Sequence, residues 1–340
     1  MNKVIIIAEA GVNHNGNLGT AKQLIDAASE AKVDYIKFQS FKADKLVNPV
    51  AKKAKYQIKN TGDKDDSQYQ MLKQLELSHE DHLELISYCN SKNISFFSTA
   101  FDVDGISYLS SLNFDILKIP SGELTNFPYL KAIANTSLPV ILSTGMANLE
   151  EIEKSVNVLI SNGTKKNLIT VLHCNTEYPT PMKDVNLKAM LTMKEKLGLS
   201  IGYSDHTLGI EVPIAAVAMG AEVIEKHFTL DRNMKGPDHK ASLEPHELKE
   251  MVKSIRNIEK AISGNGIKEA SSSEKKNIHI ARKSIHLSKN LKAGSTITEK
   301  NIIPLRPGDG ICSMNWEKVI GQKVNADLKK FTKLTWENIS

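Results

Sequence analysis

Eight short, almost wholly apolar segments recur along the first two-thirds of the chain, and they constrain its fold more than any other feature. A strand of a parallel sheet is buried on both faces, so its residues are apolar nearly throughout instead of alternating with polar ones. We therefore expect eight parallel strands. They comprise Val4–Ala8, Tyr35–Phe38, Ile94–Ser98, Ile116–Ile119, Val140–Ser143, Leu168–His173, Ser200–Tyr203 and Val223–Lys226.

Segments with helical periodicity lie between these strands. Leu18, Ala21, Ile25 and Ala28 fall on one helical face. Typical helix starts occur at Ser78 with Asp81 and at Asn148 before two glutamates. About eight βα units end near residue 262, which is the count of an α/β (β/α)8 TIM barrel. An open doubly wound sheet is the alternative, but no G-x-G-x-x-G loop follows the first strand.

One connection is much longer than the others. Residues 41–77, after the second strand, are rich in Lys and Gln and include Asn60-Thr61-Gly62-Asp63. Long βα loops of a barrel usually serve binding. We expect an extended insertion at the C-terminal face of the barrel.

The composition changes after residue 262, where Ser, Gly, Asn and Lys replace the periodic pattern. Such a stretch is typical of a linker. The remaining residues carry short β patterns and turns. The predicted division is a barrel over 1–265, a linker over 266–281 and a small, mostly-β domain over 282–340. A domain of that size has a marginal core, so we expect it to pack on its own barrel or on a neighbouring subunit.

Composition narrows the possible functions. The formal charge is +5, and Lys and Arg are spread along the chain with no basic stripe, so nucleic acid is not an expected partner. A mild positive balance suits small anionic substrates. The longest apolar runs are far too short for a membrane span, and the three cysteines offer no disulfide framework. With no signal-peptide pattern at the start, we expect a cytoplasmic protein without a membrane partner.

Polar residues stand where nearly every predicted strand ends. In a barrel these positions surround one mouth, and an unpaired polar group there would be costly to bury. We interpret the set as a binding site and not as a structural polar ring. Its members are Glu9, Lys37, Gln39, Ser98, Thr99, Lys118, Ser121, Glu123, Ser143, Thr144, His173, Asn175, Ser204, Asp205, His206 and His227.

Two histidines, His206 and His227, end consecutive predicted strands. Neighbouring strands lie about 4.8 Å apart, so the two imidazoles can reach one cation. With only two protein ligands evident, such a site would stay open to water or substrate, and Mn²⁺, Fe²⁺, Mg²⁺ or zinc would suit it. The alternative is that each histidine is a satisfied structural residue.

Two lysines, Lys37 and Lys118, are predicted at the same mouth, near Ser121, Ser143 and Ser204. Ammonium groups surrounded by hydroxyl donors suit a phosphate and a carboxylate, and phosphoenolpyruvate carries both. The alternative is that the lysines form structural ion pairs with Glu9 or Glu123.

The loop Tyr178-Pro179-Thr180-Pro181 is stiffened by its prolines, and Tyr178 offers a hydroxyl group to a sugar. Cys174 precedes this loop, and we interpret it as buried packing. For His14, polar loop filler and a place at the mouth remain equally open.

Together these segments resemble the N-acetylneuraminate (sialic acid) synthase family over almost the whole chain. The tail, with Ala281-Arg-Lys-Ser284 and Arg306-Pro-Gly308, is similar to the antifreeze-like (SAF, β-clip) domain that follows the barrel in this family. The matching barrel motifs are Glu9-Ala-Gly-Val-Asn-His-Asn-Gly16, Ile36-Lys-Phe-Gln39, Phe97-Ser-Thr99, Lys118-Ile-Pro-Ser-Gly-Glu123, Leu142-Ser-Thr-Gly-Met146, Ser204-Asp-His206, Glu225-Lys-His-Phe-Thr229 and Gly236-Pro-Asp238.

The resemblance implies condensation of phosphoenolpyruvate with N-acetylmannosamine and water to N-acetylneuraminate and phosphate. It implies a divalent metal, Mn²⁺ first and Mg²⁺ or Co²⁺ as alternatives, held by His206 and His227. It also implies a domain-swapped homodimer in which Arg306 reaches the sugar of the neighbouring subunit. The sugar would further contact Glu123, Tyr178 and Asp238. Phosphoenolpyruvate would meet Lys37, Gln39, Lys118, Ser121, Ser143, Asn175, Thr176 and Ser204.

Glu9 ends the first strand, and with Lys37 and Lys118 it is an expected catalytic residue. It would stabilise cationic character at C2 of phosphoenolpyruvate or deprotonate the attacking water. Asn175-Thr176 stands where some family members have Thr-Asn, so either residue could meet phosphoenolpyruvate. Sister enzymes that make legionaminic or pseudaminic acid are the alternative function, and a non-catalytic carbohydrate-binding protein is a more distant one.

Overall fold

The computed structural model describes residues 3–62 and 65–340. The chain divides into two compact units, one ending at Gly264 and one spanning Asn265–Ser340. Asp63, which belongs to the polar stretch expected in the insertion, lies outside the described residues.

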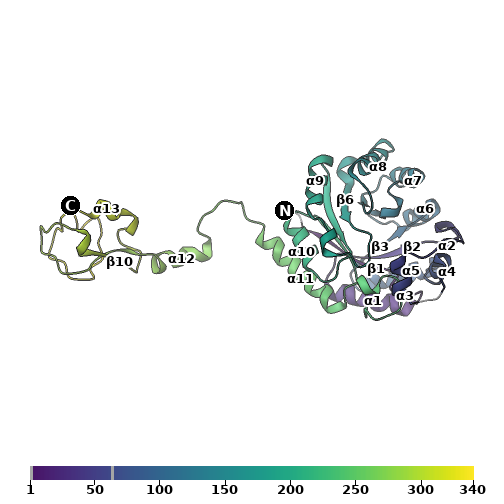
Figure 1. The fold of residues 1–340 in the computed structure, drawn as a ribbon, viewed down its shortest axis with the longest axis horizontal. Coiled ribbons are helices and arrows are strands. Elements are labelled where there is room, and N and C mark those ends of the chain that lie inside the picture. The colour runs from purple at the N-terminus through teal and green to yellow at the C-terminus, as the bar shows by residue number, and fades with distance from the viewer. Residues whose placement is uncertain (1–2, 63–64) are drawn as a thin grey trace. The chain divides into compact units, whose positions relative to one another are not determined.

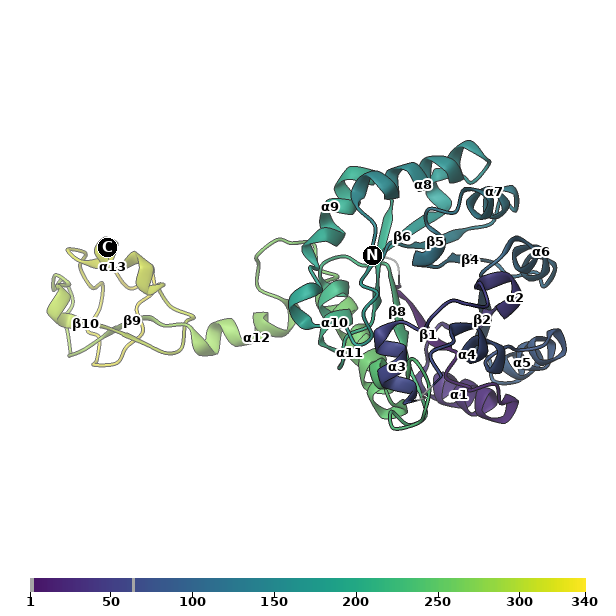
Figure 2. The ribbon, with the colours of Figure 1, turned by 45° about the vertical axis from the view of Figure 1, so that its right-hand side comes forward.

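The first unit is a barrel of parallel strands (Figures 1 and 2). The hydrogen-bonded order is β3-β2-β1-β8-β7-β6-β5-β4, and β3 also lies beside β4, which closes the sheet. The predicted TIM-barrel fold is therefore confirmed. The strands are β1 Ile5–Gly11, β2 Tyr35–Ser40, β3 Ser95–Ala100, β4 Leu117–Ile119, β5 Val140–Ser143, β6 Ile169–Cys174, β7 Ser200–Asp205 and β8 Val223–His227.

Several strands continue beyond their predicted ends. β1 runs on to Gly11, β2 to Ser40 and β7 to Asp205, because the polar residues there still pair with the next strand. Glu9, for example, is in register with Lys37 on one side and His227 on the other. The polar strand ends are thus part of the sheet, and its ladder fixes their backbone.

An outer ring of helices covers the barrel, and apolar side chains between ring and sheet form the main core. Ser78 accepts a hydrogen bond from the Asp81 amide while the Asp81 carboxylate accepts one from the Ser78 amide, so the predicted cap is confirmed. The ring comprises α1 Leu18–Ala31, α5 His79–Ser91, α6 Val103–Ser111, α7 Phe127–Asn135, α8 Leu149–Ser161, α9 Lys188–Leu197, α10 Glu211–Ala218 and α11 Pro245–Ala261. Short 3-10 turns lie at Ser121–Glu123, Lys166–Leu168, Met182–Asp184 and His239–Ala241.

The long connection after β2 contains three short helices, α2 Ala43–Leu46, α3 Lys55–Thr61 and α4 Gln68–Gln74. They enclose a small apolar cluster of their own, formed by Val12, Phe41, Met71 and Leu75. The buried Asn60 amide donates to the Pro237 carbonyl oxygen at 2.7 Å, which ties α3 to the loop after β8.

The second unit begins at Asn265, one residue before the predicted linker, and includes that linker. α12 covers Ser272–Ala281 and is capped by Ser271 and Glu274, so much of 266–281 is helical, although none of its side chains is buried. An antiparallel pair follows, β9 Ser284–Leu287 with β10 Ile302–Leu305, together with α13 Trp316–Val319 and 3-10 turns at Glu299–Asn301 and Ser313–Asn315. Isolated bridges extend the pairing at Leu291 with Leu328 and at Val324 with Ile339.

This small unit has its own apolar core, which consists of Ile285, Leu287, Leu291, Ile297, Ile302, Ile311, Val319, Val324, Leu334 and Ile339. Across residues 3–62 and 65–340, none of the helices combines the length and apolarity that crossing a membrane would need.

We expect Leu334→Ala to lower the free energy of unfolding of the C-terminal unit by about 2–5 kcal/mol, because it opens a cavity in that core. Hydrogen exchange of amides in 282–340, measured in the full chain, reports this loss. Met314→Ala is the control, since Met314 is 91% exposed. Equal loss of protection in both variants would contradict the assignment of Leu334 to a core.

Candidate functional site

The C-terminal ends of the barrel strands and the insertion after β2 enclose a cavity of about 510 Å³. This volume is within the usual range for a small-molecule site. Thirteen of the residues predicted from the sequence line it: Glu9, Lys37, Gln39, Thr99, Lys118, Ser121, Ser143, Thr176, Tyr178, Ser204, His206, His227 and Asp238.

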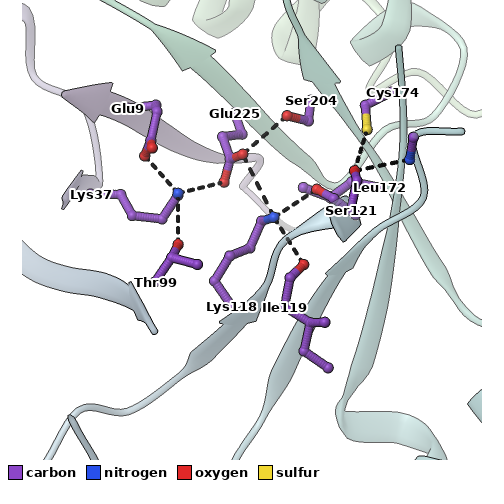
Figure 3. A network of polar contacts seen from close by, with 12 residues as sticks. Glu9, Lys37, Thr99, Lys118, Ile119, Ser121, Leu172, Cys174, Ser204 and Glu225 are labelled. Atoms are coloured by element: carbon purple, nitrogen blue, oxygen red, sulfur yellow. Dashed lines mark hydrogen bonds and ion pairs between the residues drawn. The ribbon is translucent and has the colours of Figure 1, made fainter. Parts of the chain in front are cut away.

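A row of buried charges of alternating sign crosses the floor of the cavity (Figure 3). Lys37 Nζ lies 2.6 Å from Glu9 Oε2 and 3.7 Å from Glu225 Oε2. Lys118 Nζ lies 3.8 Å from Glu225 Oε1. Glu225 on β8 therefore stands between two lysines that come from β2 and β4.

Hydroxyl groups complete the polar contacts of this row. Lys37 donates to Thr99 Oγ1 at 2.9 Å, and Lys118 donates to Ser143 Oγ at 2.6 Å. Ser204 Oγ donates to Glu225 Oε1 at 3.0 Å. Every charge in the row thus has a partner, as burial requires.

The two lysines differ in how firmly they hold their protons. Burial by itself lowers the pKa of Lys37, but the carboxylates of Glu225 and Glu9 outweigh it, so this pKa is raised. For Lys118 burial prevails over the attraction of Glu225, and the pKa is lowered. A bound anion would favour the charged form of Lys118, so this lysine has the most to gain from an anionic ligand.

Two imidazoles lie at the same end of the barrel, His227 at the end of β8 and His206 directly after β7. Their ring centroids are 5.3 Å apart. Burial lowers the pKa of His206 to about 4 and that of His227 well below its usual value, so both are neutral near pH 7. A neutral imidazole is the form that binds a metal ion.

The hydrogen bonds around these imidazoles leave nitrogen atoms available. His206 Nδ1 donates to the Asn175 carbonyl oxygen, which directs Nε2 elsewhere. His227 Nδ1 is buried without a hydrogen-bond partner, and Asp238 Oδ2 lies 4.0 Å from it. An unpartnered buried nitrogen beside a second neutral imidazole fits a divalent cation.

No group of three or more His, Cys, Asp or Glu side chains within 3–62 and 65–340 is arranged to hold a metal ion. A cation here would have the two imidazoles as its protein ligands and keep positions free for water or substrate. The open metal site expected from the sequence stays a prediction.

Aromatic rings stack above the imidazoles. The Tyr178 ring lies 4.1 Å from that of His206 and 5.2 Å from that of Tyr56 on α3, measured between centroids, and its edge meets His227. The loop after β6 and the insertion after β2 therefore meet over the histidine pair.

Of the polar strand-end set, Ser98, Thr144, His173 and Asp205 do not line the cavity. Three residues expected to contact a substrate do not line it either. The Asn175 side chain accepts from the Glu177 amide at 2.8 Å, whereas its neighbour Thr176 does line the cavity. Glu123 accepts from the Asn126 amide group at 2.6 Å. Arg306 belongs to the C-terminal unit, where its Nε donates to Ala281 O at 2.9 Å. The roles expected for these three remain predictions.

Sequence reasoning did not single out Glu225 as a site residue. The signal was present, since Glu225 is two residues before His227 on one strand and so shares its face. Tyr56 had no such signal, because its place depends on the path of the insertion. Cys174 is buried as expected, but it also lines the cavity, with its Sγ 3.2 Å from Ser121 Oγ.

Comparison with known proteins identifies the family. The NeuB family matches residues 24–268, and the SAF domain matches residues 282–340. N,N'-diacetyllegionaminic acid synthase of Campylobacter jejuni is 54% identical, covering 97% of this chain and 98% of its own. The enzyme of the same name from Legionella pneumophila is 48% identical, covering 98% and 94%.

A solved structure is also similar. It is that of N-acetylneuraminic acid synthetase from Leptospira borgpetersenii in complex with citrate, 39% identical with a TM-score of 0.70, covering 82% of this chain and 90% of that one. The sequence-based expectation of the family is confirmed. The chain belongs to the NeuB family and is a phosphoenolpyruvate-dependent nonulosonate synthase with a C-terminal SAF domain.

Proposed function

We propose that this protein is an N,N'-diacetyllegionaminic acid synthase. It would condense phosphoenolpyruvate with a 2,4-diacetamido-2,4,6-trideoxyhexose and water, giving the nine-carbon acid and phosphate. The observation that carries this proposal is the identity of 54% and 48% to two enzymes of that name, over nearly the full length of each. The alternative expected from the sequence is thereby favoured over N-acetylneuraminate synthase.

The apolar part of the cavity lining supports this substrate. Leu46, Val47 and Leu72 of the insertion, with Phe101 after β3, line the cavity and are only partly buried. A diacetamido trideoxy sugar carries two acetyl methyl groups and a C6 methyl group, whereas N-acetylmannosamine carries one acetyl group and hydroxyls at C4 and C6. An apolar wall gains more from covering methyl groups than hydroxyls.

Phosphoenolpyruvate would bind at the row of charges. Lys118 and Lys37 supply the ammonium groups for its phosphate and carboxylate. Their hydroxyl neighbours supply further donors. The residues of this subsite would be Lys37, Gln39, Lys118, Ser121, Ser143, Thr176 and Ser204.

His206 and His227 would hold the divalent metal, which we propose to be Mn²⁺, with Mg²⁺ or Co²⁺ able to replace it. When bound, the metal supplies Lewis-acid polarisation of the sugar aldehyde. Tyr178 and Asp238, which lie over and beside the imidazoles, would orient the sugar there. Burial raises the pKa of Asp238 to about 7, so it can donate or accept a hydrogen bond near neutral pH.

In the reaction, C3 of phosphoenolpyruvate attacks the aldehyde carbon, whose oxygen takes up a proton, and positive charge develops at C2. Glu9 is buried and paired with Lys37, so with phosphoenolpyruvate bound at Lys37 its carboxylate would lie near that charge. Glu9 would stabilise the cation or take the proton of the attacking water. The tetrahedral intermediate then loses phosphate by C–O cleavage. Holding both substrates in one cavity lowers the entropic cost of their encounter.

We expect Glu9→Gln to lower kcat more than tenfold with little change in the KM of either substrate, because the neutral amide cannot balance the charge at C2. Steady-state phosphate release measures this. Glu84→Gln, which alters an exposed surface pair with Lys22, is the matched control. Unchanged turnover in Glu9→Gln would rule out a catalytic role for Glu9.

We expect the wild-type enzyme to show a kcat/KM at least tenfold higher for the 2,4-diacetamido trideoxy sugar than for N-acetylmannosamine. In an apolar pocket, one methylene group more or less changes kcat/KM by about 10–200-fold. Leu72→Gln should reduce that ratio by weakening the apolar wall. Leu83→Gln, on the exposed face of α5, should leave it unchanged. A wild-type preference for N-acetylmannosamine would overturn the proposed product.

A further inference from the structure

A further buried ion pair, separate from the row of charges in the cavity, is formed by Asp205 and Lys226, the residues directly before His206 and His227. It lies on the opposite face of the sheet from the cavity. Lys226 Nζ is 2.6 Å from Asp205 Oδ2, and neither side chain has any solvent exposure. Asp205 and Lys226 are register partners on β7 and β8. Because successive strand residues point to opposite faces, they face away from the cavity that Ser204, Glu225 and His227 line.

Thr207 forms hydrogen bonds with both members of this pair, and the three residues make one network. Its amide donates to Asp205 Oδ1 at 2.9 Å and its hydroxyl to Asp205 Oδ2 at 3.1 Å, while Lys226 also donates to its carbonyl oxygen. The network thus fixes both neighbours of His206 in the chain. The carbonyl of His206 itself accepts from the Thr180 amide at 2.8 Å.

Stability alone does not account for so deeply buried a pair. Removing two charges from water costs several kcal/mol per ion, and apolar pairs of similar volume are often as stable or more so. Directional bonds, however, fix positions in a way that apolar contacts do not. These bonds act on the residues directly before and after His206 and directly before His227.

We infer that Asp205, Lys226 and Thr207 are positioning residues that hold the two imidazoles at the spacing required by one divalent cation. A site with only two protein ligands depends strongly on their placement, since no third side chain corrects an error. This inference rests on the proposed metal-binding role of His206 and His227.

The test is Mn²⁺ binding to the full chain, measured from the free-ion electron paramagnetic resonance signal, together with calorimetric Tm. The double variant Asp205→Leu with Lys226→Met replaces the pair by apolar groups. We expect its Kd for Mn²⁺ to rise about 10–100-fold, while its Tm changes little. An unchanged Kd, whatever the Tm, would overturn the positioning role.

Thr207→Val is a milder variant that removes only the hydroxyl donor, and we expect a several-fold rise in Kd. Ser155→Ala is its matched control, because Ser155 is a buried hydroxyl on α8 that donates to Leu124 O, away from the cavity. If the double variant does not fold, the Kd of Thr207→Val for Mn²⁺ tests the inference by itself. A value within twofold of the wild-type Kd would overturn it.

Measurements on the wild-type protein and on His206→Ala distinguish failure of the proposed metal site from failure of the positioning role. If wild type does not bind Mn²⁺, or if His206→Ala binds it equally well, the proposed metal site is wrong. If wild type binds and His206→Ala does not, an unchanged Kd in the network variants refutes only the positioning role.

Discussion

The buried row of Glu9, Lys37, Glu225 and Lys118 is the constraint on which the site depends. Two carboxylates and two amino groups are buried there, and each lies within 4 Å of a group of opposite type. The row needs side chains from β1, β2, β4 and β8 at one end of a closed sheet, so it cannot form in part. An anionic substrate at Lys118, the member whose pKa burial lowers, would strengthen the row.

The same closure explains what the sequence could predict. Apolar runs mark strands because strands buried on both faces admit few polar residues, and parallel strands all end at one rim. The convergence of Lys37, Lys118, His206 and His227 therefore follows from finding the strands and reading the residue at each end. The predicted boundaries are less accurate, because the expected strands stop at Ala8 and Tyr203 whereas the ladder continues through Glu9 and Asp205.

Features that depend on tertiary contacts could not be predicted from the sequence. The helical path of the insertion is fixed by contacts such as Asn60 with Pro237, and only that path brings Tyr56 onto Tyr178. In the Asn175-Thr176 pair, the Asn175 side chain caps a local turn and Thr176 lines the cavity, which residue type alone did not decide. The helix α12 could not be predicted from an apolar periodicity, because it buries no side chain and its composition is polar.

The shared motifs indicate the type of reaction more clearly than the preferred sugar. The motifs that pointed to the family lie mostly on strand ends, at the charges and imidazoles that we propose to bind phosphoenolpyruvate and metal. Those groups would handle the reacting atoms, which are the same whichever amino sugar is used. The apolar wall of Leu46, Val47 and Leu72 lies instead on the insertion, whose sequence has no strand pattern to guide its interpretation. A small change in that wall could alter the preferred sugar and leave every charged residue of the row in place.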